Sequence, residues 1–503
     1  MICPHCRLNS FMSDASKVHP IESNDESMSC PTAKRSRSSG QLDISEAPWK
    51  SAITALLTCV SRQDCIEALS SSFRVFNHSN EQTHDEEIIS GADAALCRLL
   101  SFLLFKELAE GEGRHTHAAS STTSETQGRR VIRISDEITC TCQIIEMIYR
   151  CSKEVLETSF QKVGPDFLHL LSSILAQIPE HSTATPSADM KSAHMCLRSL
   201  TKVLCHYARV HSATMSMAHH PRLLSLMIFL LQHPVGIIPF EAHHNALWVL
   251  ANMACCNENM QRMASHDRLL DTIIQAANIM HEIDETRPIH HHALRLQHSA
   301  FRCLLNLSWD QHNKTLMSER DDLVKTIGKT VDMKTVPGSG NEARNSLGTM
   351  LLQTRMFALG TLRNIAHTPS PQKFRLCTTQ DGMLLNLLSE TALSVEEDPS
   401  VRDKAFAVIF NLVSPDTAEM LILHPTLLDS LAEAALVPSN LQLQGASTAE
   451  SASTMSFRSL NALNQAVATR GSEDCRVKVR QAIEQVNMAR RFHNMAVPLE
   501  GTI

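Results

Sequence analysis

Apolar residues recur three and four positions apart in run after run along this chain, which is the spacing of one face of an α-helix. The runs begin near Trp49, and polar stretches separate them. The clearest stripe is the last one, formed by Cys475, Val479, Ala482, Ile483, Val486 and Ala489. Only 4% of the residues are aromatic, while Leu, Ala and Met are frequent, which favours helices over strands. The pattern therefore predicts an all-α fold.

Changes in composition along the chain divide it into regions. The first stretch is rich in Ser, Pro and charged residues, so it cannot bury enough apolar surface to offset the entropy cost of ordering. A later stretch rich in Gly, His, Ser and Thr is typical of a linker. We expect a disordered tail at 1–45, an N-terminal helical region at 46–110, a linker at 111–130, repeats at 131–470 and a capping helix at 471–495. Two further loops are expected, at Thr335–Ser346 and Pro438–Thr454.

A short motif recurs within the repeat region. It consists of Ala, then Leu or Ile four residues later, then Asn two residues further on, followed by an apolar and a small residue. Four segments carry it: Ala246–Ala254, Ala300–Ser308, Ala358–Ala366 and Ala405–Val413. A fifth, Ala193–Thr201, has Ser199 in place of Asn. Each segment is followed by a polar break and a second apolar run, so agreement at five sites predicts an internal repeat.

Placed on a helix, the motif separates apolar positions from the Asn position. The Ala and Leu or Ile positions fall on one side, which must pack against other helices because a short helix pair cannot bury its own face. The expected core residues are Ala246, Leu250, Ala300, Leu304, Ala358, Leu362, Ala405 and Ile409. Asn is a mediocre helix former, so helix stability does not explain its recurrence on roughly the opposite side. Its amide can hold the backbone of an extended peptide, or it can bond a neighbouring repeat and fix the stacking.

The repeated segment resembles the third helix of an armadillo repeat, and the apolar runs that follow resemble the first and second helices of the next repeat. The resemblance covers about residues 135–435. It implies a right-handed superhelical solenoid of armadillo-like helical repeats, whose third helices line a concave groove. It also implies that Asn252, Asn306, Asn364 and Asn411 line that groove. Insertions such as His281–His292 make the spacing longer than is usual in the family.

These positions define a predicted partner-binding site. Its residues are Trp248, Asn252, Arg302, Asn306, Trp309, Asn364 and Asn411. The Asn side chains would bond a partner's backbone, the two Trp side chains would supply apolar contact area, and Arg302 would offer a cation to an acidic segment. We expect this row to be exposed inside the groove. The chain is then expected to be a scaffold or adaptor that binds extended segments of other proteins, and not an enzyme.

Two other functions stay open at this point. Importin-alpha-type receptors for nuclear signals repeat Trp-x-x-x-Asn along their groove. Here Trp248 and Asn252 match that pattern, whereas Arg302 and Gly360 take the place of Trp in the next two repeats. A nuclear-transport adaptor would show affinity for Lys/Arg-rich peptides. A helical subunit of an enzyme complex, or an enzyme, would show a pocket that gathers Cys, His or acidic side chains with perturbed pKa values.

Composition restricts the expected partners and location. The formal net charge of -7 gives no overall positive field to attract nucleic acid. No apolar run approaches the length of roughly 18 residues that spans a bilayer, and the N-terminus lacks the apolar run of a secretory signal, so no membrane association is expected. The 16 Cys are irregularly spaced, many within apolar runs, which indicates reduced core thiols. A cytoplasmic or nuclear protein is expected.

Short motifs add no chemistry to this picture. Cys3-Pro4-His5-Cys6 copies a thiol-oxidoreductase motif, but it lies in the predicted disordered tail without the strand and helix that lower a thiol's pKa. His290–His292 falls in a predicted solvated loop. Lys34–Ser38 is a short basic cluster that could serve as a nuclear-import signal or a phosphorylated segment. No catalytic residue, metal site or cofactor is expected.

Overall fold

The computed structural model describes residues 188–233, 238–279, 291–333, 342–394, 396–436 and 452–496. All of them belong to one compact unit, Pro48–Ile503. The expected tail, N-terminal helical region and linker lie outside the described residues, as does the part of the repeat region before residue 188.

The described helices fall into three classes that alternate along the chain. The short first helices are α8 (His211–His219), α11 (Asn257–Ala264), α14 (Gln311–Ser318), α17 (Ser370–Thr378) and α20 (Ala418–Leu423). The second helices are α9 (Leu223–Gln232), α12 (Leu269–Asn278), α15 (Asp321–Asp332), α18 (Met383–Leu393) and α21 (Leu427–Leu436). The third helices are α7 (Ala188–Tyr207), α10 (Phe240–Met253), α13 (His291–Leu307), α16 (Glu342–Ile365), α19 (Pro399–Leu412) and α22 (Ala452–Arg470). A short 3-10 turn, η3 (Thr379–Gly382), precedes α18, and α23 (Glu473–Ala496) follows α22. None of the described helices combines the length and the apolar character needed to cross a membrane.

Local sequence explains where several of these helices begin. The Asp310 carboxylate precedes α14 and accepts a hydrogen bond from the Asn313 backbone N–H at 3.0 Å. Asp398 accepts one from the Ser400 backbone N–H at 2.8 Å at the start of α19. Both are N-caps, which satisfy donors that have no partner within the helix. Gly382 has a φ of 81°, a conformation that favours glycine, and lets the chain turn sharply from η3 into α18.

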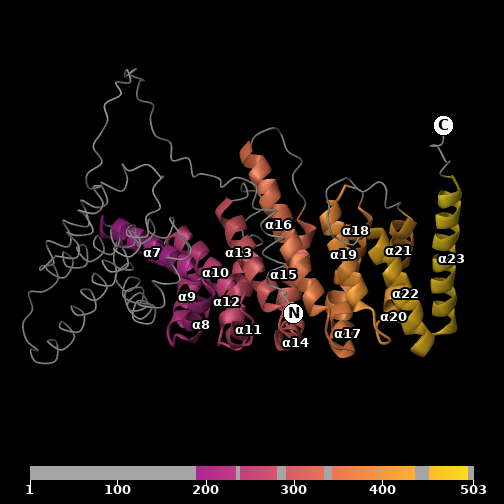
Figure 1. Ribbon diagram of the computed structural model, residues 1–503, viewed down its shortest axis with the longest axis horizontal. Coiled ribbons are helices and arrows are strands. Elements are labelled where there is room, and N and C mark those ends of the chain that lie inside the picture. The colour runs from indigo at the N-terminus through magenta and orange to yellow at the C-terminus, as the bar shows by residue number, and fades with distance from the viewer. Residues whose placement is uncertain are drawn as a thin grey trace, which may run out of the picture. The chain divides into compact units, whose positions relative to one another are not determined.

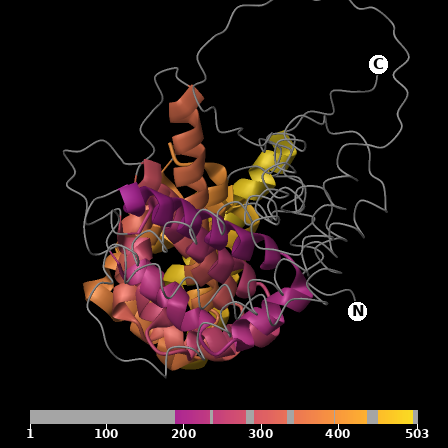
Figure 2. The same ribbon diagram turned by 90° about the vertical axis from the view of Figure 1, so that its left-hand side faces the viewer.

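Each class of helix stacks on its own kind in the neighbouring repeats. α10 packs against α7 and α13, and the series continues through α16, α19 and α22. The first helices stack in the order α8, α11, α14 and α17, and the second helices in the order α9, α12, α15, α18 and α21. Figure 1 shows the labelled helices following one another in chain order from α7 to α23, and Figure 2 views the stack from the α7 side. The described chain is an all-α solenoid of armadillo-like three-helix repeats.

The repeated apolar positions form the core of this stack, as predicted. Ala246, Leu250, Ala300, Leu304, Ala358, Leu362, Ala405 and Ile409 all have 0% of their surface exposed. Small residues also let the third helices approach each other. A Cβ atom added to Gly360 of α16 would lie 3.0 Å from a methyl group of Leu305 on α13, so glycine permits this close contact.

Two expected loops are shorter than composition suggested. α16 begins at Glu342 and α22 begins at Ala452, so the last residues of both loops belong to helices. At the start of α16 this follows from the run Glu342-Ala343-Arg344, which consists of good helix formers. His291 and His292 are exposed, but they lie in the first turn of α13 and not in a loop.

A second recurring position of the third helices bonds the C-terminal ends of the second helices. It lies nine residues before the recurring Asn. Its side chain hydrogen-bonds a backbone carbonyl at the end of the preceding second helix. These side chains belong to His243, Gln297, Arg355 and Arg402, and the carbonyls to His233, Ala277, Val331 and Ala392, at 2.9–3.2 Å. The last carbonyls of a helix have no partner within it, so these bonds satisfy groups that would otherwise be buried unpaired. In α22 the same task falls to Ser453, which donates to the Ala435 carbonyl at 3.1 Å.

α23 covers the last described repeat. Its stripe residues Cys475, Val479, Ala482 and Val486 are buried, which confirms the predicted apolar face. The helix packs against α20, α21 and α22. Arg490 donates two hydrogen bonds to the Ala435 carbonyl, at 2.8 and 3.0 Å, so the C-terminal end of α21 is tied to α23 as well. An apolar stripe on one side and a polar surface on the other is what a terminal cap needs.

The cysteines of the described residues are free thiols, and most are buried. Burial raises the pKa of both Cys205 and Cys377 to about 12. These thiols therefore stay protonated at neutral pH and behave as small core residues, as expected from their place in apolar runs.

Leu250→Ala should lower the free energy of unfolding by about 2–5 kcal/mol, because it opens a cavity in the stack of third helices. Leu423 offers a matched control, since it is 57% exposed at the end of α20. Leu423→Ala removes the same atoms from the surface and should cost about 0.5 kcal/mol or less. Urea denaturation followed by circular dichroism measures both, and equal losses would mean that α10 is not packed as described.

Val479→Asp should destabilise the C-terminal end of the stack, because Val479 has 0% of its surface exposed and the new carboxylate would be buried without a partner. Val477 lies on the same helix and is 40% exposed. We expect Val477→Asp to melt within about 2 °C of the wild type, and Val479→Asp to melt several degrees lower and to aggregate. Thermal scans with light scattering test this, and indistinguishable scans would remove the capping role of α23.

Candidate functional site

The predicted site residues lie on or directly after the third helices of four successive repeats. Trp248 and Asn252 are on α10, Arg302 and Asn306 on α13, Asn364 on α16 and Asn411 on α19, while Trp309 follows α13. Because these four helices pack side by side in chain order, the residues form a row that crosses the repeats.

Arg302 joins α13 to α10 through two of the predicted residues. Its guanidinium carbon lies 4.2 Å from the centre of the Trp248 ring, and its Nη2 donates a hydrogen bond to Asn252 Oδ1 at 3.3 Å. Burial is the main cause that lowers the pKa of Arg302, and the nearby Arg209 lowers it further. The cation is thus held between an aromatic ring and an amide. Among the described residues, the buried Nδ2 of Asn252 has no hydrogen-bond partner.

The Asn side chains of the other three repeats each reach back to the repeat before. Asn306 Nδ2 donates to the Ala251 carbonyl at 2.8 Å. Asn364 Nδ2 donates to Ser308 Oγ, and Asn411 Nδ2 donates to the Arg363 carbonyl, both at 2.9 Å. The recurring Asn therefore ties adjacent third helices together, which is the stacking role that the sequence left open.

The expected exposure of the whole row is only partly found. Asn252 and Asn306 are buried, with 9% and 7% of their surfaces exposed, whereas Asn364 and Asn411 are half-buried. The prediction of exposure is wrong for the first two. Arg302 of the next repeat bonds Asn252, and Asn306 directs its amide to the buried Ala251 carbonyl of the repeat before. On α10, Leu247 and Ala251 are also completely buried, so this helix has no fully polar side.

Trp309 is the most exposed member of the row, with 50% of its surface accessible. It follows the end of α13, and its backbone N–H donates to the Asn306 carbonyl at 3.2 Å. An exposed Trp next to a fixed helix end is a suitable anchor for a partner, because its large ring loses little conformational freedom on binding.

A second pair of recurring Asn residues was missed by the sequence analysis. Asn259 and Asn313 lie seven residues after Asn252 and Asn306, on the first helices α11 and α14, and both have 0% of their surface exposed. Asn259 Nδ2 donates to the Thr214 and Met253 carbonyls, at 3.0 and 3.1 Å. Asn313 Nδ2 makes the equivalent bonds to the Met260 and Leu307 carbonyls, both at 3.0 Å. The spacing of seven was a usable signal, but it occurs in only two repeats.

Histidines of the third helices are held neutral near these residues. Burial is the main cause that lowers the pKa of His298 to about 4, with Arg302 and Arg295 contributing. Burial likewise lowers the pKa of His244 to about 3, followed by Arg295 and His298. The positive charge of this part of the surface at neutral pH therefore belongs to the arginines.

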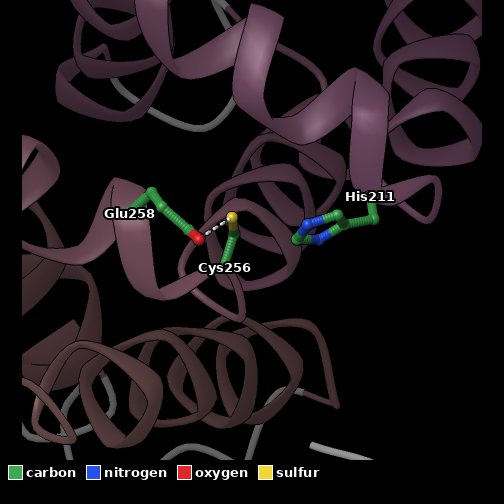
Figure 3. A group of neighbouring side chains, drawn as sticks. All are labelled: His211, Cys256 and Glu258. Atoms are coloured by element: carbon green, nitrogen blue, oxygen red, sulfur yellow. Dashed lines mark hydrogen bonds between the residues drawn. The ribbon is translucent and has the colours of Figure 1, made fainter. Parts of the chain in front are cut away.

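A group of potential metal ligands lies away from the row, where α8 meets α11. Side-chain atoms of His211, Cys256 and Glu258 lie within 4.8 Å of one another, with the Cys256 sulfur between the other two in the view of Figure 3. The Cys256 thiol donates a hydrogen bond to Glu258 Oε2 at 2.9 Å. Burial is the main cause that raises the pKa of Cys256, and Glu258 contributes. The thiol–carboxylate bond is local to the start of α11, while the Cys256 sulfur also lies 3.3 Å from the Met215 sulfur of α8.

No protein-family model matches the chain, and no curated protein matches it. An engineered protein of solved structure is 15% identical with a TM-score of 0.42, and the match covers 88% of this chain and 99% of that one. A computationally designed armadillo repeat protein for modular peptide recognition is 14% identical with a TM-score of 0.38, covering 57% and 98%. A designed armadillo repeat protein in complex with the peptide (KR)4 is 16% identical with a TM-score of 0.33, covering 62% and 99%. The three-helix repeats of this chain themselves give it an armadillo-like fold.

Proposed function

We propose that the chain is a protein-interaction scaffold that binds extended peptide segments of partner proteins along its third helices. One observation carries this proposal. Arg302, Trp309, Asn364 and Asn411 stay partly or largely exposed on successive repeats, although most of each third helix is buried. Asn364 and Asn411 occupy the same position in adjacent repeats, and this spacing suits a ligand whose backbone also repeats, such as an extended peptide.

The Asn amide groups of the row indicate which atoms would bind a peptide backbone. Asn364 and Asn411 both use Nδ2 to bond their own protein. Within the described residues neither Oδ1 atom accepts a hydrogen bond from the protein, so these oxygens are acceptors for the backbone N–H groups of a ligand. Trp309 would supply the apolar anchor beside them. Lys/Arg-rich nuclear signals would meet Arg302 on this surface, so the alternative of a nuclear-transport adaptor gains no support from the site.

Asn306→Ala should lower the free energy of unfolding by about 1–3 kcal/mol, because the substitution removes the buried hydrogen bond that Asn306 Nδ2 donates to the Ala251 carbonyl. Asn411→Ala changes the same repeat position on α19, where the bond to the Arg363 carbonyl is exposed to solvent. Its cost should be about 1 kcal/mol or less. Urea denaturation of both variants tests whether burial separates the two positions, and equal costs would contradict this account of the stacking bonds.

Peptides selected on the full chain from a random dodecapeptide display library should bind through Trp309. Trp309→Ala should weaken the best peptide by at least about tenfold, because truncating an aromatic anchor often costs 2 kcal/mol or more. Phe374→Ala is the matched control, since Phe374 is 46% exposed on the first helix α17, and it should change the affinity by less than about twofold. Fluorescence anisotropy measures both. A library without binders, or peptides that depend on Phe374 alone, would contradict the proposal.

A further inference from the structure

We propose that the peptide segment bound along the third helices is acidic, with its carboxylates placed against Arg302, Arg363 and Lys404. The inference rests on the proposed function and deepens it by naming the chemistry of the partner. The three cations are not part of the repeat motif, because each occupies a different position relative to the recurring Asn.

The three cations lie on consecutive third helices. Arg302 is on α13, Arg363 is exposed on α16 immediately before Asn364, and Lys404 is half-buried on α19. The bond from Asn411 to the Arg363 carbonyl fixes α19 against α16. Arg363 is close enough to Lys404 to lower the pKa of that ammonium group, although burial is the larger cause. α13, α16 and α19 thus carry like charges on helices that pack directly against each other.

The carboxylates of the protein do not neutralise this row. In the described part of the chain, neither Arg302 nor Arg363 forms an ion pair, and Lys404 has only its neighbour Asp403 as a nearby acid. The described ion pairs between repeats use other cations, in Arg320–Asp271, Arg355–Glu397, Arg375–Asp321 and Arg470–Asp416. The row is therefore positive on a chain whose formal net charge is -7.

Arg302 and Lys404 are partly buried and form no ion pair within the described residues, which raises the energy of the free protein, and an anionic ligand offsets that cost on binding. A ligand that reaches all three must span three packed helices, which is about 16–20 Å at the usual interaxial distance of 8–10 Å. A single phosphate group is too small for this. An extended peptide rises about 3.3 Å per residue, so a segment of about six residues spans the row.

The test uses the same dodecapeptide selection, now scored by charge. Peptides selected on the full chain should be enriched in Asp and Glu relative to the unselected library. In the best peptide, replacing each Glu by Gln and each Asp by Asn keeps the shape and removes the charge, and should weaken binding by at least about tenfold at 0.15 M salt. The affinity of the acidic peptide should also fall as salt rises, while that of its neutral counterpart should not.

Charge reversal on the protein provides the second arm. Arg363→Glu combined with Lys404→Glu should weaken the acidic peptide by at least about tenfold. Lys325→Glu combined with Lys329→Glu makes the same change in net charge on two exposed residues of the second helix α15, and should change the affinity by less than about twofold. Circular dichroism checks the folding of both variants. If the reversed variant does not fold, Arg363→Gln combined with Lys404→Gln should show the same loss in smaller measure.

The outcomes separate this inference from the proposed function. Peptides that need Trp309 but show no acidic enrichment, or that tolerate the reversal at Arg363 and Lys404, would overturn the acidic specificity and leave the scaffold standing. The absence of any peptide that depends on Trp309 would overturn both. A dodecameric oligothymidylate that binds more tightly than the best acidic peptide would also overturn the inference, because the row would then be selecting nucleic acid.

Discussion

Burial of the third helix between two neighbouring third helices is the constraint on which this structure depends. A single repeat has one helix of each class and cannot cover the apolar surface of its own third helix. Stacking solves this, and it explains why Ala246 and Leu250 have no exposed surface while Leu247 and Ala251 are buried as well. α23 covers the last described repeat in the same way, since its stripe residue Val479 has no exposed surface.

Stacking also buries backbone carbonyls, and side chains at recurring repeat positions donate hydrogen bonds to them. The ends of the second helices lie against third helices, so their last carbonyls need donors from outside the helix. His243, Gln297, Arg355 and Arg402 supply them from one repeat position. The recurring Asn performs a related task between third helices, as the bond from Asn306 to the Ala251 carbonyl shows. Polar residues at fixed places in the repeat thus set the register of the stack.

Only what the stack leaves uncovered is available for binding. Among the predicted residues this favours Trp309, with Asn364 and Asn411 half-buried and Arg302 held by Trp248 and Asn252. Asn252 and Asn306 contribute more to the scaffold than to its surface. The charged residues Arg363 and Lys404 are not part of the repeat motif. The residues at these positions can therefore differ from repeat to repeat without disturbing the core. Under the proposed function, the repeat would set the spacing of the binding surface, and these positions would set its preference for charge.

By itself the sequence determined the helical class, the order of the helices, the repeated core positions from Ala246 to Ile409 and the apolar stripe of α23. These follow from periodicity, which depends only on local helix geometry. It could not decide between binding and stacking for the recurring Asn, because both readings place an amide on the same side of an isolated helix. Nor could it reveal the position shared by His243, Gln297, Arg355 and Arg402, whose side chains differ in type and share only an acceptor. Tertiary structure showed the stacking bonds of the recurring Asn, whose partners lie 48–56 residues away in the chain, and the bonds of this shared position, whose partners lie 10–24 residues away. Both depend on contacts between helices, which the periodicity of a single helix does not contain.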